Sequence, residues 1–272
     1  MAGQIPQLTL AGFLRSIWKI LAGRPKSPPA LEGNLLLQTI LNRRSARRFD
    51  GRPLPEDVFA AILEAGRLAP STVNLQTWTF ALFTRETWQS TFGRSIPFRA
   101  ARAVIVLGDV HRNRAVLQAF PHSPQIEYTI AVINASLAAM NMNMAAEALG
   151  VASVMLSETG RSGLLDVGYL RDKLCLPDGV FPLMTIVFGY PAGGEAPMPP
   201  KLPLEEISFK DCKYHETNPA VLQDWLEQMT AGYKAMSPFS SLEAQLKVYE
   251  SKIGKAEEEL ERMIFPQDGK QT

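Results

Sequence analysis

Cysteine and histidine are scarce in this sequence of 272 residues. The two cysteines, Cys175 and Cys212, lie far apart and form no CxxC pair, and the three histidines are scattered. Disulfide scaffolds need several paired cysteines, and structural zinc sites need closely spaced cysteines or histidines. Both classes are therefore excluded. The low cysteine content favours a reducing compartment, so we expect a cytoplasmic protein.

An excess of charge of one sign is also missing. The chain has 28 Lys and Arg against 27 Asp and Glu, which gives a net charge of +1. Proteins that recruit nucleic acid use a broad positive field, which this chain lacks. We therefore expect no nucleic-acid partner, and any basic site has to be local. With 46% hydrophobic and 20% charged residues, a folded globular chain with a sizeable core is expected.

No long apolar run is free of polar side chains. Residues 128–146 carry no charge over nearly the length of a membrane span, but Asn134, Asn141 and Asn143 interrupt them. Amides are costly in hydrocarbon. This segment is therefore expected to be a helix buried on most sides, at the centre of a domain or at a subunit interface.

The N-terminal segment has the pattern of a short amphipathic helix. No basic residue precedes its apolar stretch, and Arg15 and Lys19 interrupt it, so we expect no secretory signal peptide. Apolar residues recur at helical spacing over residues 10–21, and a linker of Pro and Ser, residues 25–29, follows. Two alternatives stay open. The helix docks on its own chain or a second copy, or it contacts a membrane surface through Trp18 and flanking basic residues.

Apolar periodicity and turn residues predict an alternation of helices and strands. The expected helices cover residues 34–44, 53–68, 126–149, 169–174 and 218–236, and the expected strands cover residues 78–84, 103–108, 151–156 and 181–189. A loop rich in Pro and Gly follows at residues 191–203. This order predicts an α+β or α/β layered core in which helices cover a sheet.

The C-terminal segment has a heptad pattern. Apolar residues alternate by four and three positions from Leu242 to Met263, and Glu and Lys occupy the other faces. This helix either lies on the body of its own chain or pairs across a dimer. The chain is thus divided into an N-terminal helix and linker, residues 1–33, a central domain, residues 34–210, and a C-terminal helical extension, residues 211–272.

Positive charge is concentrated in one short segment, RRSARRF, at residues 43–49. Guanidinium groups bind phosphate through paired charge-assisted hydrogen bonds, and Ser45 adds a hydroxyl donor. The alternative is a solvated basic helix end, where arginine is favourable beside the helix dipole. No second basic patch with interleaved aromatic residues accompanies the segment, which again disfavours nucleic acid.

A second segment, APSTVNLQTW at residues 69–78, is a polar loop between an expected helix and an expected strand. Its hydroxyl and amide groups are suited to hydrogen-bond the edge of a polar heterocycle. The alternative is an ordinary capping and turn segment, in which Ser, Thr and Asn are common.

Taken in this order, the two segments resemble the motifs of the FMN-dependent nitroreductase family. An RRSxRxF element is followed by a helix opened by proline and then by APSxxNxQxW. The segment AAEALGV, residues 145–151, looks like that family's long helix and its ALG turn. FGYP, residues 188–191, and PKLPLEE, residues 200–206, look like its strand end and the basic loop that follows. The resemblance covers residues 34–209.

The resemblance implies an α+β fold in which a mixed sheet is flanked by helices and two chains form an intertwined homodimer. It implies that residues 34–210 bind FMN at the dimer interface, with each flavin contacted by both chains. It also implies an enzyme, an oxidoreductase that passes electrons from NAD(P)H or another donor to a nitroaromatic, quinone or enone. Since no GxGxxG fingerprint is present, a nicotinamide donor is expected to visit the flavin pocket in turn.

Specific flavin contacts follow when the family pattern is carried over. The residues implied at the phosphate and the polar ring edge are basic or hydroxylated: Arg43, Arg44, Ser45, Arg47 and Lys201. The residues implied to line the ring from the partner chain belong to the polar loop: Pro70, Ser71, Thr72, Asn74 and Gln76. The residues implied along the isoalloxazine, with their backbone facing N5, are Leu156, Ser157 and Glu158.

Four positions depart from the family's usual residues, and one of them is Lys201, where relatives more often have arginine. Ser157 and Glu158 stand where relatives often have two glycines, and Thr77 stands where they often have proline.

No catalytic triad or metal site is implied, because the flavin carries the electron chemistry and the protein binds and tunes it. Two other hypotheses remain open: a non-catalytic flavin-binding protein whose extensions block the pocket, and a docking protein on a nitroreductase-like core.

Overall fold

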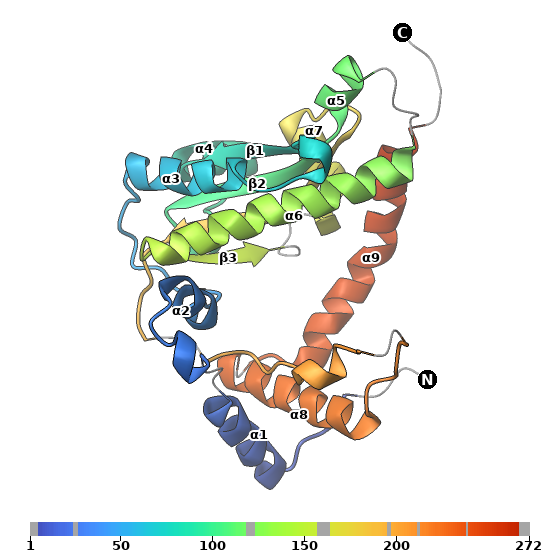
Figure 1. Ribbon diagram of the computed structural model, residues 1–272. Coiled ribbons are helices and arrows are strands. Elements are labelled where there is room, and N and C mark those ends of the chain that lie inside the picture. The colour runs from blue at the N-terminus through green and yellow to red at the C-terminus, as the bar shows by residue number, and fades with distance from the viewer. Residues whose placement is uncertain are drawn as a thin grey trace. The chain divides into compact units, whose positions relative to one another are not determined.

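The computed structural model describes residues 5–23, 27–117, 123–156, 164–194, 197–210, 213–237 and 239–266. The chain divides into two compact units (Figure 1). Unit 1 comprises residues 1–29 and 195–251, and unit 2 comprises residues 30–194 and 252–272.

A four-stranded sheet forms the centre of unit 2. Its described strands are β1 (Trp78–Phe83), β2 (Arg102–Asp109), β3 (Ala152–Leu156) and β4 (Val180–Gly189). Their order is β1-β2-β4-β3, and each neighbouring pair is antiparallel. A parallel bridge between Ser45 and Ser153 gives the β3 edge its mixed character. Each strand lies within one residue of its predicted ends.

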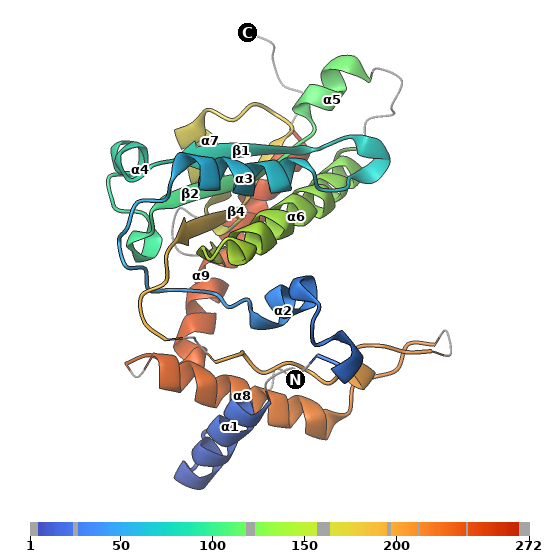
Figure 2. The same ribbon diagram turned by 60° about the vertical axis from the view of Figure 1, so that its left-hand side comes forward.

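Helices cover both faces of this sheet (Figures 1 and 2). One face packs against α3 (Glu56–Arg67) and α6 (Pro124–Ala148), and the other packs against α4 (Arg85–Phe92) and α7 (Val167–Leu174). Side chains of β2 alternate between the two cores, since Val104 joins the first and Ile105 the second. Burial on both faces explains why this strand reads as a continuous apolar run. The predicted α+β sheet flanked by helices is confirmed.

Apolar periodicity did not predict two short helices, α4 and α5 (His111–Val116). Helix α4 buries only Trp88 and Phe92, and its start is fixed by a capping box of Thr84 and Thr87. Helix α5 has no buried residue. Neither helix has the apolar stripe from which longer helices such as α2 (Leu35–Asn42) are recognised.

Helix α6 buries one face and exposes the other. Its inner face is lined by alanine, and Ala135 and Ala138 are fully buried in the core. On its outer face Ile133, Leu137 and Met140 are 52%, 41% and 43% exposed. A helix at this place is confirmed, but one chain alone leaves an apolar face of it uncovered.

The C-terminal part of α9 (Leu242–Ile264) packs on its own chain. Ala256 and Met263 are buried in unit 2, and the Glu259 carboxylate accepts a hydrogen bond from the Gly168 N–H at 3.0 Å. Of the two alternatives for the heptad helix, packing on its own chain therefore holds for residues 252–264. Ile253, another residue of the heptad pattern, is 49% exposed.

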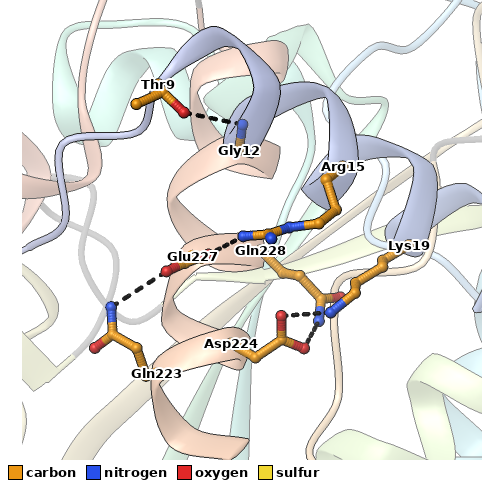
Figure 3. A network of polar contacts seen from close by, with 8 residues as sticks. All are labelled: Thr9, Gly12, Arg15, Lys19, Gln223, Asp224, Glu227 and Gln228. Carbon is orange, nitrogen blue, oxygen red and sulfur yellow. Dashed lines mark hydrogen bonds and ion pairs between the residues drawn. The ribbon is translucent and has the colours of Figure 1, made fainter. Parts of the chain in front are cut away.

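In unit 1, α1 (Leu10–Ala22) docks on α8 (Pro219–Met236) (Figure 3). Arg15 pairs with Glu227 at 3.2 Å, and Lys19 pairs with Asp224 at 2.6 Å. Ile20 is buried against α8 at Gly232. A β-carbon at Gly232 would lie 3.2 Å from the Ile20 Cδ1 atom, so the glycine leaves room for the Ile20 side chain. Docking of the N-terminal helix on its own chain is therefore confirmed.

The opposite face of α1 is apolar and uncovered. Its exposed side chains recur at intervals of three and four residues: Leu10, Leu14, Trp18 and Leu21. Among the described residues, no helix has both the length and the apolar character needed to span a bilayer.

Candidate functional site

The arginine segment, residues 43–50, is held in an extended conformation at the edge of the sheet. The Ala46 N–H donates to the Ser153 carbonyl at 3.0 Å, and the Asp50 N–H donates to the Tyr190 carbonyl at 3.0 Å. The segment therefore runs from the β3 edge to the end of β4. Its position is fixed by backbone pairing, so its side chains are left for other contacts.

Three guanidinium groups of the arginine segment have no partner in the part of the chain that the structure describes. Among the described residues, Arg43, Arg47 and Arg48 form no side-chain hydrogen bond and no ion pair. Arg44 instead donates through Nη1 to the carbonyls of Leu41 at 2.6 Å and Arg43 at 2.9 Å, while its Nε is buried without a partner. Such unneutralised donors are suited to a phosphate group.

The polar loop, residues 70–77, has a strained backbone. Val73, Asn74 and Gln76 have φ values of 48°, 58° and 50°, in the left-handed region that favours glycine. Asparagine tolerates this region, but for a β-branched valine it is a clear outlier. Strain of this kind persists only where surrounding contacts hold it, and it is concentrated at ligand-binding sites.

Asn134 of α6 forms three hydrogen bonds with the polar loop. Its Oδ1 accepts from the Thr72 N–H at 3.1 Å and from the Thr72 hydroxyl at 3.2 Å. Its Nδ2 donates to the Thr77 hydroxyl at 2.9 Å. Asn134 and Thr77 are each 1% exposed. The Thr77 side chain, which departs from the family's usual proline, is therefore the acceptor of a buried amide.

A second set of contacts braces the end of the polar loop. Arg112 donates to the Gln76 carbonyl at 3.3 Å and also to the Trp78 carbonyl. The Asp109 carboxylate lies 3.1 Å from the Arg112 Nε atom, and the Asp109 side chain is only 6% exposed. Asn113 donates to the Leu75 carbonyl at 3.1 Å. The start of α5, which the sequence did not predict, thus supports the loop.

Two buried amides of α6 form hydrogen bonds to the predicted site segments or beside them, and the sequence interpretation missed them. Asn134 bonds the polar loop, and Asn143 donates to the Ser153 hydroxyl at 2.9 Å beside the arginine segment. The sequence contained a signal, because a buried amide in an apolar helix needs hydrogen-bond partners. It was interpreted only as evidence against a membrane span.

Within one chain, the two predicted site segments lie at opposite ends of the sheet. Trp78, which follows the polar loop, is in register with Phe181 of β4 through β2. Ser153, which bridges Ser45, pairs with Phe188 of β4. Those two phenylalanines are seven positions apart along the strand, which is roughly 23 Å at about 3.3 Å per residue. One chain therefore does not bring the arginine segment and the polar loop together.

The remaining predicted residues have three different locations. Leu156 ends β3, and its side chain is buried in the core on the α4 and α7 side, so it offers a ligand only its backbone. Ser157 and Glu158 lie outside the described residues. Lys201 is exposed on a loop of unit 1, before the short helix Leu204–Glu206.

A separate groove of about 500 Å³ lies near α4 and includes Arg85, Glu86 and Arg99 in its lining. The Arg85 guanidinium donates to the carbonyls of Ala100 at 3.0 Å and Gly51 at 3.1 Å. The pKa of Glu86 is lowered by a hydrogen bond from the Thr84 hydroxyl, by the backbone N–H of Glu86 itself and by the positive charge of the adjacent Arg85. None of the predicted flavin residues lines this groove, and its Arg85 guanidinium already donates hydrogen bonds within the chain.

Comparison with known proteins identifies what this arrangement is similar to. The family model described as Nitroreductase family matches residues 40–190. An NADPH-dependent oxidoreductase of Staphylococcus aureus (strain MRSA252) is 28% identical over 208 residues, which cover 71% of this chain and 81% of that protein.

Two solved structures are similar in fold. The structure of B. megaterium NfrA2 has a TM-score of 0.70 at 19% identity, covering 88% of this chain and 99% of that one. An NADPH:FMN oxidoreductase from Vibrio harveyi complexed with NAD+ has a TM-score of 0.64 at 22% identity, covering 80% of this chain and 92% of that one.

Proposed function

Because the chain belongs to the nitroreductase family and is an oxidoreductase, we propose that it is a homodimeric, FMN-dependent enzyme. It takes electrons from NADPH or NADH and passes them to an electron-poor planar substrate such as a nitroaromatic, quinone or enone. The observation that carries this proposal is that the guanidinium groups of Arg43 and Arg47 have no partner among the described residues.

The arginine segment supports FMN as the flavin. A phosphate monoester accepts several charge-assisted hydrogen bonds, and Arg43, Ser45 and Arg47 offer donors for them. Arg44 contributes through its backbone or its buried Nε. Positive charge that reaches the N1 and C2=O edge of the ring stabilises negative charge there.

Two features support a site completed by a second copy of the chain. The polar loop lies roughly 23 Å from the arginine segment along the sheet, so the loop is proposed to serve the partner's flavin. The exposed Ile133, Leu137 and Met140 of α6 form an apolar face suited to a dimer interface. The residues proposed to line the ring from the partner are Pro70, Ser71, Thr72, Asn74 and Gln76.

The protein's residues bind and orient while the cofactor supplies the redox chemistry. Bound FMN would supply the hydride and electron chemistry between the donor and the substrate. The backbone of Leu156, Ser157 and Glu158 is proposed to flank N5. The polar loop is proposed to cover the ring from the other chain, which orients the flavin and excludes water from it.

The nicotinamide donor is inferred from similar proteins. The Staphylococcus relative is named for NADPH, and the Vibrio structure contains NAD+. Since this sequence has no GxGxxG fingerprint, the donor is proposed to occupy the substrate's place in turn, which gives ping-pong kinetics. We further propose residues 34–210 as the FMN-binding domain with two helical extensions, and a cytoplasmic location in keeping with the low cysteine content.

The proposal is tested on the purified, untagged protein. We expect flavin absorption near 450 nm (roughly one FMN per chain), release of FMN on heating, identified by mass, and anaerobic bleaching by NADPH. Initial rates with a quinone acceptor are expected to give parallel double-reciprocal lines. A chain that takes up no added FMN would contradict the cofactor assignment. Intersecting lines would contradict the proposal that the donor and the substrate occupy the same pocket in turn.

A further inference from the structure

The polar loop combines strain with exposure. Val73 has a φ of 48° and its side chain is 83% exposed. Its conformation is therefore not stabilised by burial of its own side chain. Asn74 and Gln76 are exposed as well. The contacts that hold this backbone must come from other residues.

Asn134 contacts the polar loop on both sides of its strained residues. Thr72 precedes Val73 and Asn74, and Thr77 follows Gln76. Asn134 accepts two hydrogen bonds from Thr72 and donates one to Thr77. The amide therefore joins the beginning of the loop to its end. Because the Thr72 N–H has to face an acceptor, this pattern fixes the orientation of the amide.

Burial makes this contact more important than the others that reach the loop. Asn134 is 1% exposed, whereas the Arg112 side chain, which reaches the Gln76 carbonyl, is 60% exposed. Water can replace an exposed donor, but a buried donor or acceptor that loses its partner keeps its full desolvation cost. Loss of the Asn134 amide would leave the Thr72 N–H without its protein acceptor.

We infer that Asn134 is a positioning residue for the flavin site: it holds residues 72–77 in the conformation that faces the ring. The inference rests on the proposed function, which assigns this loop to the partner's flavin. Asn134 lies on α6 beside Ile133, which belongs to the exposed apolar face. The same helix thus carries the proposed dimer interface and the anchor of the loop that crosses it.

The side-chain chemistry distinguishes three substitutions. Asn134→Leu keeps much of the volume but removes all three hydrogen bonds. Asn134→Asp keeps the acceptor for Thr72, and the Thr77 hydroxyl can turn to donate to the second oxygen. Asn141→Leu is the matched control, because Asn141 lies on the same helix and donates to the Ala65 carbonyl at 3.1 Å, away from the loop.

The first readout is amide hydrogen exchange of a peptide spanning residues 70–77 in the FMN-free protein. Asn134→Leu is expected to speed this exchange about tenfold, since it removes three hydrogen bonds to the loop, of which the one to Thr77 is buried. Asn141→Leu is expected to stay within about twofold of the wild type. Asn134→Asp, which keeps hydrogen bonds to the loop but buries a carboxylate, is expected to exchange more slowly than Asn134→Leu. The second readout is the dissociation constant of added FMN, which Asn134→Leu is expected to raise about tenfold.

The outcomes separate this inference from the proposed function. Loop exchange that is unchanged in Asn134→Leu, or equally fast in Asn141→Leu, would overturn the role of Asn134. If the wild type binds no FMN, the proposed function fails, but the exchange comparison still decides whether Asn134 holds the loop. Should Asn134→Leu not fold, Thr77→Val removes one of the three bonds alone and is expected to speed exchange severalfold.

Discussion

Replacing Arg47 by alanine gives the sharpest view of the phosphate site. Arg47 is exposed and has no partner within the described part of the chain. The substitution is therefore expected to change the free energy of unfolding by no more than about 0.5 kcal/mol. Loss of a charge-assisted hydrogen bond to phosphate is expected to cost about 1.5–3 kcal/mol of FMN binding. This corresponds to a dissociation constant roughly 10 to 150 times higher.

Arg48→Ala provides the matched control. Arg48 is the next residue, is also exposed and also lacks a partner among the described residues. In an extended segment successive side chains point to opposite sides, so Arg48 is directed away from a ligand that Arg47 contacts. Arg48→Ala is expected to leave the FMN dissociation constant within about twofold of the wild-type value.

The assay is quenching of FMN fluorescence on titration with the FMN-free protein, repeated at low and high salt. Because salt screens charge pairs, wild-type affinity is expected to fall more steeply with salt than that of Arg47→Ala. Urea unfolding of both variants checks that stability is unchanged. Equal FMN affinity in Arg47→Ala and the wild type would refute the assignment of this segment to the phosphate.

Two further predictions concern the dimer and the core. Leu137→Glu places a carboxylate on the exposed apolar face of α6, and its burial in a dimer interface without a partner would cost several kcal/mol. Analytical ultracentrifugation should then detect monomers, and these should bind FMN more weakly. An intact dimer would argue against this interface. Gly66→Ala brings a β-carbon to 2.7 Å from the Met142 Cγ atom, so urea unfolding should report a loss of about 1–3 kcal/mol. Gly254→Ala, with nothing within 4 Å, should instead stabilise α9 by up to about 1 kcal/mol; equal effects of the two alanines would refute the close packing of α3 on α6.

Local patterns were sufficient for most of the fold. Strand β2 was recognisable because burial on both faces makes it continuously apolar. Helix α6 was recognisable from its length without charge, and α9 from its heptads. Helix α4 was missed because most of its sequence is polar and its stability depends on a capping box and two buried aromatic residues.

The two segments of the candidate site could be identified in the sequence, but the hydrogen bonds that hold the polar loop could not. The arginine segment and the polar loop are contiguous in sequence, so their chemistry could be read directly. The hydrogen bonds of Asn134 reach residues 57 and 62 positions away. No local pattern reports such a contact, and the strain at Val73 becomes visible only with the backbone angles.

Each flavin site is proposed to take its arginine segment from one chain and its polar loop from the other. Mixed dimers of an Arg47→Ala chain and an Asn74→Ala chain, purified with two different tags, test it directly. If the sites are shared, each mixed dimer keeps one intact site and binds roughly one FMN with near wild-type affinity, whereas either variant alone binds weakly. If both segments of a site came from the same chain, the mixed dimer would have no intact site, and weak binding at both sites would show that the two chains do not share the flavin sites.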